Sequence, residues 1–224
     1  SKAGHILGYW RNNNLTTDGK WKDIANVENL SLTSSSSHYA DITNIGGITG
    51  ELTWSVWAKK GDDTTTMYML GRSSADLFEL NNNEGVRIRI ASDSHLFTSG
   101  GTVSSITDWH HYVTTRDSNN LVKIYVDGSE KAIYDGSSYV LGGIEKAGTS
   151  NIDYIGRDSS SYFNGSLDNV GIWETELSSS DISSLYNAGR GADARSVLSG
   201  TTGDLKAYWQ FETENLLSAT SAKD

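Results

Sequence analysis

Four polar or aromatic side chains stand close together in one short stretch rich in Gly, Ser and Asn. They are Arg157, Asp158, Tyr162 and Asn164. Guanidinium, carboxylate and amide groups are planar hydrogen-bonding groups that suit the hydroxyls of a ligand, and a tyrosine ring offers a flat apolar face with a polar tip. This is the chemistry of binding a hydroxyl-rich molecule such as a sugar. The alternative is a solvated loop without a ligand, and the residues alone leave both interpretations open.

The residues that catalysis needs are not arranged for it. Glycoside hydrolysis uses two carboxylates at a set separation, and the E-x-D-x-x-E run that often supplies them does not occur. The closest pair at alternate positions, Glu212 and Glu214, has no third partner. His110 and His111 are adjacent, so in a strand they point to opposite faces and do not suit one zinc ion. No G-x-S-x-G elbow or phosphate-binding glycine loop is present, and we predict that the chain is not an enzyme.

The composition disfavours several classes of partner. The 224 residues include 18 basic and 28 acidic side chains, a formal net charge of -10, and such a field repels nucleic-acid phosphates and anionic lipid headgroups. No run approaches the roughly 18 apolar residues of a membrane-spanning helix, and the first residues lack the charged and then apolar pattern of an export signal. Cysteine is absent, which excludes disulfides and thiolate metal sites. We predict no nucleic-acid partner and no membrane insertion.

Short alternating segments predict the strands that must position these residues. In Leu52–Lys60 the apolar side chains share one face, and Trp57 lies on the other. The shared face consists of Leu52, Trp54, Val56 and Ala58. In Val86–Ile90 the apolar residues alternate with Arg87 and Arg89, which we expect to point outward. A chain with many such segments is typical of an antiparallel β-fold.

Three tryptophans lie within apolar runs. They are Trp54, Trp109 and Trp173. Burying a ring of this size stabilises a fold by about 2–3 kcal/mol. We therefore expect these rings in the core rather than as platforms for a sugar.

One short surface helix is expected near residues 178–188. Ser178 suits the N-cap, Asp181 stands at the position of a capping box, and Gly189 suits the C-terminal cap. Apolar residues recur between them at helical spacing: Ile182, Leu185 and Tyr186. We expect this helix to cover one end of the sandwich, with a loop at 189–203 after it.

A short motif occurs near both ends of the chain. Gly8–Arg11 and Ala207–Gln210 each contain a Tyr-Trp pair between a small and a polar residue. The simpler interpretation is that both are strands of one sheet, so that residues 1–224 form a single domain with its termini together. The alternative is that the second copy opens a further, truncated domain.

An ordered series of motifs is more specific than any one of them. The series is Leu52–Lys59, Trp109–Val113, Val122–Gly128, Tyr154–Asp158 and Phe163–Trp173, followed by the expected helix. In this order it resembles the laminin-G-like and pentraxin superfamily over about residues 28–188. The resemblance implies an all-β fold: a two-sheet antiparallel jelly-roll sandwich of the concanavalin A type. Gly8–Arg11 is also similar, more weakly, to segments of bacterial and phage surface proteins.

The resemblance also implies a function and a place. Domains of this kind bind carbohydrate, so we expect a non-catalytic module that takes a cell-surface glycan through Arg157, Asp158, Tyr162 and Asn164. We expect it outside the cell, at a cell surface or on a virion. The alternative is a structural or adhesion domain of a phage or bacterial surface protein, which makes protein contacts within a larger assembly and binds no sugar.

Calcium is the cofactor that the resemblance implies. Asp158 stands where pentraxin-like domains have acidic calcium ligands, and Asp168 resembles an aspartate placed before the valine strand in related jelly rolls. Carboxylate oxygens are the hard donors that Ca²⁺ prefers. The sequence departs from the family pattern at Thr33-Ser34, where an Asp-Gly anchor is frequent. The alternative is that both aspartates cap turns by accepting bonds from backbone N–H groups.

Overall fold

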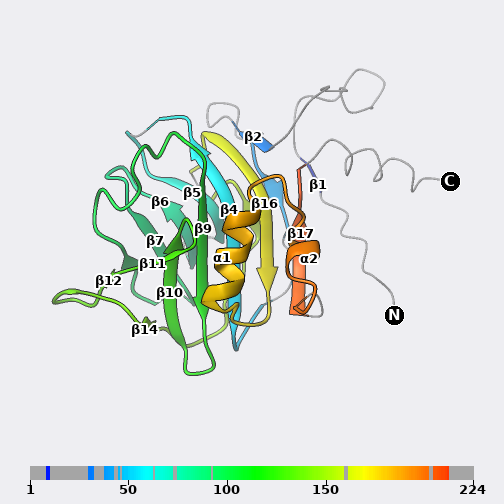
Figure 1. Ribbon diagram of the computed structural model, residues 1–224. Coiled ribbons are helices and arrows are strands. Elements are labelled where there is room, and N and C mark those ends of the chain that lie inside the picture. The colour runs from blue at the N-terminus through cyan, green and yellow to red at the C-terminus, as the bar shows by residue number, and fades with distance from the viewer. Residues whose placement is uncertain are drawn as a thin grey trace, which may run out of the picture.

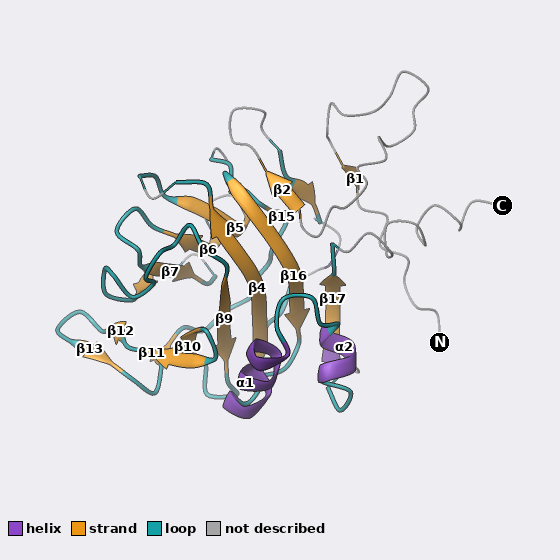
Figure 2. Cartoon of the chain, turned by 45° about the horizontal axis from the view of Figure 1, so that its top comes forward, coloured by secondary structure: helices purple, strands orange, loops and turns teal. Residues whose placement is uncertain are grey.

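The computed structural model describes residues 9–10, 30–32, 38–42, 45, 47–62, 64–72, 75–91, 93–158, 161–201 and 204–211. In this part of the chain the strands form two antiparallel sheets that pack against each other, and two helices lie outside one of them (Figures 1 and 2). The predicted all-β sandwich of two antiparallel sheets is confirmed.

One sheet has seven strands. In spatial order they are β1 (Tyr9–Trp10), β3 (Ala40–Asp41), β15 (Tyr154–Ile155), β5 (Met67–Arg72), β6 (Asp76–Leu80), β7 (Val86–Arg89) and β8 (Leu96–Phe97). Strands far apart in the sequence are neighbours here, since β15 lies between β3 and β5. This order brings the segment after Ile155 beside β5.

The other sheet has eight strands. Six follow one path: β11 (Ser129–Lys131), β10 (Leu121–Val126), β9 (His110–Arg116), β4 (Leu52–Lys60), β16 (Gly165–Trp173) and β17 (Leu205–Trp209). Off this path, β14 (Ile144–Glu145) pairs with β10 and β2 (Leu30–Leu32) pairs with β16. A separate hairpin of β12 (Ile133–Tyr134) and β13 (Tyr139–Val140) adjoins β8 through a bridge between Thr98 and Ile133.

The main core lies between the two sheets. The four apolar residues predicted to share a face of β4 are all buried there, as are Val86 and Ile88 of β7. Trp54 packs against Phe78 of the opposite sheet, with ring centroids 6.4 Å apart. Large apolar side chains buried in this way stabilise a fold by about 1.5–3 kcal/mol each. Alternation along the strands therefore sets which side of each sheet faces inward.

The predicted helix is present as α1 (Ser179–Ala188). The Ser178 side chain accepts a bond from the Asp181 backbone N–H, and Asp181 in turn accepts one from the Ser178 N–H, which completes the capping box. Gly189 ends the helix with φ +82°, a value that favours glycine. The expectation that this helix covers one end of the sandwich is wrong. Instead, α1 lies against the outer face of the eight-stranded sheet (Figure 1).

A second core lies beneath this helix. It contains Trp173 from β16, Val113 and Tyr125 from β9 and β10, and apolar residues of the two helices. The expected loop at 189–203 includes a short helix, α2 (Ala194–Val197), because the Asp193 side chain accepts a bond from the Arg195 N–H and caps it. Neither described helix is long and apolar enough to cross a membrane.

Two further expectations are wrong. Trp109 is only half-buried, because it stands on the outer side with Arg190 and Lys59 over its ring at 4.6 and 5.5 Å. The two Tyr-Trp segments do not share a sheet, since β1 pairs with β3 and β17 pairs with β16 in the other sheet. Glu212, Glu214 and Thr33-Ser34 lie outside the described residues, and the single-domain assignment of residues 1–224 stays a prediction.

Candidate functional site

Arg157 stands among three tyrosine rings at the side of the seven-stranded sheet. Its guanidinium carbon lies 4.4 Å from the ring centroids of Tyr39 and Tyr154 and 5.2 Å from that of Tyr162. Tyr39 contacts Tyr154 edge-on at 5.6 Å and Tyr162 at 6.1 Å. All four side chains are partly exposed. We call this group the tyrosine–arginine cluster.

Neighbouring strands position the cluster. Tyr39 precedes β3 and Tyr154 belongs to β15, the strand between β3 and β5. Because Ile155 is in the core, Tyr154 points to the outer side of the sheet. After β15 the chain turns at Gly156, where φ is +84°, and a bridge pairs Arg157 with Tyr162. The sheet thus assembles in space what the sequence separates by more than a hundred residues.

A glycine in β5 lets this loop pass over the sheet. A Cβ on Gly71 would lie 2.5 Å from the Arg157 carbonyl oxygen and 3.0 Å from the Asp158 Cα. Gly71 pairs with Tyr154 on one side and with Leu77 on the other, so it faces outward with Tyr154. The backbone at 157–158 therefore crosses the outer face of β5, which a larger residue at position 71 would prevent.

Asp158 is buried and acts within its own turn. Its Oδ1 accepts a 2.7 Å bond from the Ser161 N–H, its own N–H donates to the Ser161 carbonyl at 3.1 Å, and its carbonyl accepts from Arg157 Nε at 2.6 Å. This is the turn-capping role that the sequence left open beside calcium binding. The turn presents Arg157 and Tyr162 from its two sides.

Asn164 ends the same loop and contacts the loop that follows β4. Its Nδ2 donates to Asp62 Oδ2 at 3.3 Å, and its carbonyl accepts from the Gly61 N–H at 2.7 Å. Its own N–H lies 3.4 Å from the sulfur of Met67 at the start of β5. Of the four predicted site residues, the structure brings Arg157 and Tyr162 into contact, gives Asp158 the turn between them and places Asn164 at the side.

A row of side chains continues across the sheet from this cluster. Tyr68, Glu79 and Arg87 are opposite one another on β5, β6 and β7, and Arg87 is opposite Phe97 on β8. Their neighbours in each strand are in the core, so this row faces outward. We call the outer side of the seven-stranded sheet, with this row and the cluster, the polar face.

Charges are paired within the row. Glu79 is buried and forms an ion pair with Arg87. Burial raises the pKa of Glu79, and the Arg87 guanidinium opposes that rise. Burial also raises the pKa of Tyr68, with contributions from the charges of Glu79 and Asp158. The Gly156 N–H donates to the Met69 carbonyl at 2.8 Å, so the chain that leads into the turn of Asp158 runs beside β5 next to Tyr68.

Asp168 is in a different place from Asp158. It lies in β16 of the other sheet, is completely buried, and forms a 2.6 Å ion pair with Arg190. Its Oδ1 also accepts bonds from the Asn169 and Phe211 N–H groups at 2.8 and 3.4 Å. Burial raises the pKa of Asp168, and the Arg190 bond opposes this. This aspartate links β16 to the segment after α1 and to the end of β17.

The two aspartates do not form one calcium donor set. They stand on different sheets, and each accepts bonds from the chain itself. Within the described ranges, no three His, Cys, Asp or Glu side chains are close enough together to hold a metal ion. Calcium binding at Asp158 and Asp168 stays a prediction, and no part of the site below depends on it.

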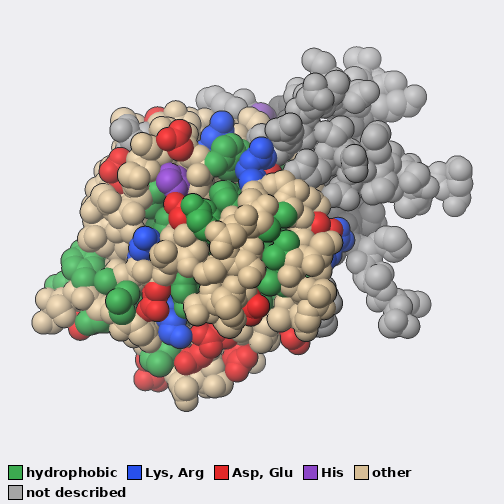
Figure 3. Space-filling view, in the orientation of Figure 1, with side chains coloured by type: hydrophobic (Ala, Val, Ile, Leu, Met, Phe, Trp, Pro, Cys, Tyr) green, Lys and Arg blue, Asp and Glu red, His purple; other side chains and the backbone are tan. Residues whose placement is uncertain are grey.

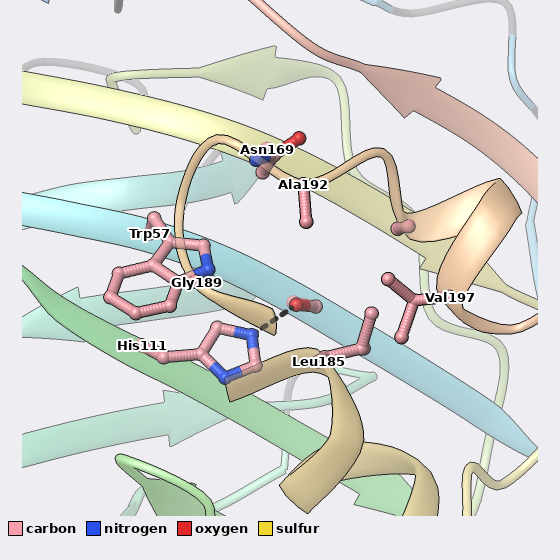
Figure 4. A pocket seen from close by; sticks show the side chains of 9 residues that line it. Trp57, His111, Asn169, Leu185, Gly189, Ala192 and Val197 are labelled. Carbon is pink, nitrogen blue, oxygen red and sulfur yellow. Dashed lines mark hydrogen bonds between the residues drawn. The ribbon is translucent and has the colours of Figure 1, made fainter. Parts of the chain in front are cut away.

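A small pocket lies on the opposite side, between the eight-stranded sheet and the helices (Figure 4). Ser55, Trp57, His111, Leu185 and other residues line it, and it has room for about one water molecule. His111 Nε2 and Ser55 Oγ are 2.8 Å apart. Burial lowers the pKa of His111 to about 3, so the imidazole is neutral and a poor base near pH 7. The contact to Ser55 uses one ring nitrogen, and Nδ1 of His111 is buried without a hydrogen-bond partner in the described part of the chain.

Comparison with known proteins identifies the fold family. A family model described as the concanavalin A-like lectin/glucanases superfamily matches residues 34–183. The chain belongs to this superfamily. The match includes β15, the turn of Asp158 and the whole of β16, so the polar face is built from superfamily elements. No protein of the curated set matches the sequence.

Several solved structures have a similar fold. The CBM40 domain of a Ruminococcus gnavus IT-sialidase, in complex with α2,3-sialyllactose, has a TM-score of 0.54 at 13% identity, over 71% of this chain and 97% of that one. A candidate carbohydrate-binding protein from Bacteroides ovatus has a TM-score of 0.55 at 15% identity, over 78% and 49%. A heptameric SAP-like pentraxin from Limulus polyphemus has 0.51 at 12%, over 65% and 73%. At these identities the likeness shows the fold alone.

The sequence missed several members of the site. No sequence motif indicated Tyr39 or Tyr68 as site residues. Each lies in a different segment of the chain from Arg157, and the three segments become neighbours only through the strand order of the sheet. Tyr154 was within a recognised motif, and its place one residue before the inward Ile155 is the signal that it faces outward. Arg87 was expected to point outward, which is correct, but its pairing with a buried glutamate was not foreseen.

Proposed function

We propose that this chain is a non-catalytic carbohydrate-binding module whose glycan site is the tyrosine–arginine cluster on the polar face. The observation that carries this proposal is the guanidinium of Arg157 framed by three partly exposed tyrosine rings. Tyrosine rings provide flat apolar area for the C–H faces of a sugar, and their hydroxyls and the guanidinium provide hydrogen-bonding groups for its hydroxyls. Asn164, two residues after Tyr162, and its partner Asp62 on the loop after β4 border the site.

The comparisons support this proposal by analogy. One structure of similar fold is a CBM40 domain bound to a sialylated sugar, and another is described as a candidate carbohydrate-binding protein. We accordingly propose a glycan partner and a location outside the cell, at a cell surface or on a virion. If calcium takes part, Asp158 is the aspartate that lies beside this site.

The buried carboxylates of the polar face are engaged by the chain itself. Glycosidases present two carboxyl groups to the scissile bond, about 5–9.5 Å apart. On the polar face the buried carboxylates are Glu79, paired with Arg87, and Asp158, bonded to its own turn. Neither of these two is presented to solvent as an acid or a nucleophile must be.

A glycan array with matched variants tests the proposal. Wild type, Arg157→Gln and Tyr162→Ala are compared, with Arg195→Gln as control, because Arg195 lies 5.3 Å from the Tyr208 ring on the helix side and mimics the arginine–tyrosine contact. We expect Arg157→Gln to weaken binding about tenfold or more, since hydrogen bonds to charged groups contribute about 1.5–3 kcal/mol, and the control to bind as wild type. Repeating the array in calcium and in chelator shows whether the ion contributes.

Two results would count against this proposal, the first against the location of the site and the second against carbohydrate binding itself. Unchanged binding by Arg157→Gln and Tyr162→Ala would move the site elsewhere on the sandwich. No binding to any glycan, together with a stable oligomer in solution, would instead support a structural or adhesion domain that contacts protein. Melting curves of every variant accompany the array, so that loss of folding is distinguished from loss of contact.

A further inference from the structure

The hairpin β12–β13 exposes an aromatic surface next to the polar face. Tyr139 is 47% exposed and Leu141 is 66% exposed, and both are large apolar side chains. Tyr139 contacts Tyr134 at 5.3 Å between ring centroids. In Figure 3, hydrophobic side chains gather at the edge where Figure 1 places this hairpin. We call the hairpin with these three residues the aromatic arm.

The aromatic arm joins the row of the polar face. Tyr134 stacks on Phe97 of β8 with ring centroids 5.3 Å apart and an interplanar angle of 26°. Phe97 is opposite Arg87 across the β7–β8 pair, and Arg87 is opposite Glu79. The bridge between Thr98 and Ile133 fixes β12 beside β8. The row therefore continues from Tyr68 to Tyr139, and at its other end the backbone of Gly156, beside the cluster, bonds to Met69, the residue after Tyr68.

We propose that the glycan is an extended chain of several sugar units, lying across the strands from the tyrosine–arginine cluster to the aromatic arm, and not a single terminal sugar. This inference rests on the proposed carbohydrate-binding function and specifies its ligand. The cluster holds one end of the chain, and the arm supplies a second platform at the other.

The length of the row agrees with a chain and not with one sugar. Neighbouring strands lie about 4.8 Å apart, so the four steps from β15 to β8 span about 19 Å before the arm begins. One sugar ring stacks on one aromatic side chain. Two aromatic platforms at the two ends of such a row require a ligand that reaches both.

The composition of the row favours a glycan over a protein partner. Its middle is the ion pair of Glu79 and Arg87, and glutamate is among the residues that are depleted in the cores of protein interfaces. Aromatic rings stand at both ends of the row with the charged pair between them, and a ligand that offers both apolar ring faces and hydroxyls can use both kinds of group. Among the described residues, large exposed apolar side chains are confined to the arm.

The test is a chain-length series. Isothermal titration measures the affinity of ladders from monosaccharide to octasaccharide, prepared from cellulose, laminarin, chitin and arabinan, together with the best glycans of the array. For a polymer that binds, we expect wild-type affinity to rise with length and then level off. We expect Tyr139→Ala to lose about two- to twelve-fold on the long members only, the range for one aromatic contact. Leu141→Ser, at a more exposed position, is a second arm variant if Tyr139→Ala does not fold.

The outcomes separate the two proposals. If short and long members bind equally, and the arm variants bind both as wild type, the extended chain is wrong and the carbohydrate-binding function stands. If Arg157→Gln weakens every length whereas Tyr139→Ala weakens only the long ones, both are supported. If no ladder and no array glycan binds to folded wild-type protein, both are overturned.

Discussion

On both outer faces of this sandwich, outward residues alternate with residues of the main core. The two faces differ in whether those outward residues are covered. On the eight-stranded sheet, outward residues such as Trp173 and Tyr125 are buried beneath α1 and α2 in a second core. On the seven-stranded sheet, outward residues such as Tyr154 and Tyr162 stay partly exposed around Arg157. Alternation tells which residues leave the main core. Whether they then become a second core or a binding surface depends on where the helices pack.

The comparison extends to the polar groups of the two faces. Under the helices, Asp168 and His111 are buried and bonded to Arg190 and Ser55, so they tie the covering segment and the sheet together. On the polar face, Asp158 shapes a turn whose neighbours on either side are partly exposed. Both aspartates are structural, but on the polar face the turn of Asp158 stands beside one guanidinium that three partly exposed tyrosine rings surround.

The largest expected effect comes from truncating the second core. Trp173→Ala should lower the free energy of unfolding by about 3–5 kcal/mol, because the ring is 2% exposed and nothing replaces it. The matched control Trp109→Ala should cost only about 1–2 kcal/mol, since that ring is half-buried and its main partners are two cations. Urea unfolding monitored by circular dichroism measures both. Equal costs would contradict the placement of Trp173 in a second core.

A smaller effect is expected on the free energy of unfolding as the pH falls. Burial lowers the pKa of His111 to about 3, so the folded protein binds fewer protons there than the unfolded chain, whose imidazole titrates near pH 6.5. The stability that this group contributes is full above about pH 6.5 and is lost as the pH falls toward 3. Between pH 7 and pH 5 the loss is about 2 kcal/mol, at about 1.4 kcal/mol for each unit below 6.5.

Paired variants check this assignment. His111→Phe combined with Ser55→Ala removes both partners of the buried bond, and its unfolding free energy should fall by about 2 kcal/mol less than that of wild type from pH 7 to pH 5. His110→Gln should act in the opposite sense. The hydrogen bond to Asp127 raises the pKa of His110, so its contribution is present below pH 6.5 and is lost as the pH rises through the folded pKa. Identical pH slopes in wild type and the double variant would contradict the account.

Much of the framework was predictable because it depends on local patterns. The alternating residues of Leu52–Lys60 and the capping box of Ser178 and Asp181 each act within a few residues, and both were identified correctly. The side of the sandwich that the helix covers was not, because α1 is amphipathic wherever it packs. The partners of Arg157 were also missed, since the insertion of β15 between β3 and β5 is a long-range pairing that no local pattern encodes.

We propose that glycans bind on the polar face and not on the helix side, and one measurement tests this directly. An amide chemical-shift titration of ¹⁵N-labelled protein with the best-binding oligosaccharide reports every contact region at once. We expect the shifts to concentrate at Tyr39, Tyr154, Arg157 and Tyr162, to continue along β7 and β8 toward the aromatic arm for a long chain, and to leave α1 and α2 unchanged. Shifts centred on α1, Trp173 or the pocket of His111, with the tyrosine–arginine cluster silent, would contradict the assignment of the binding face.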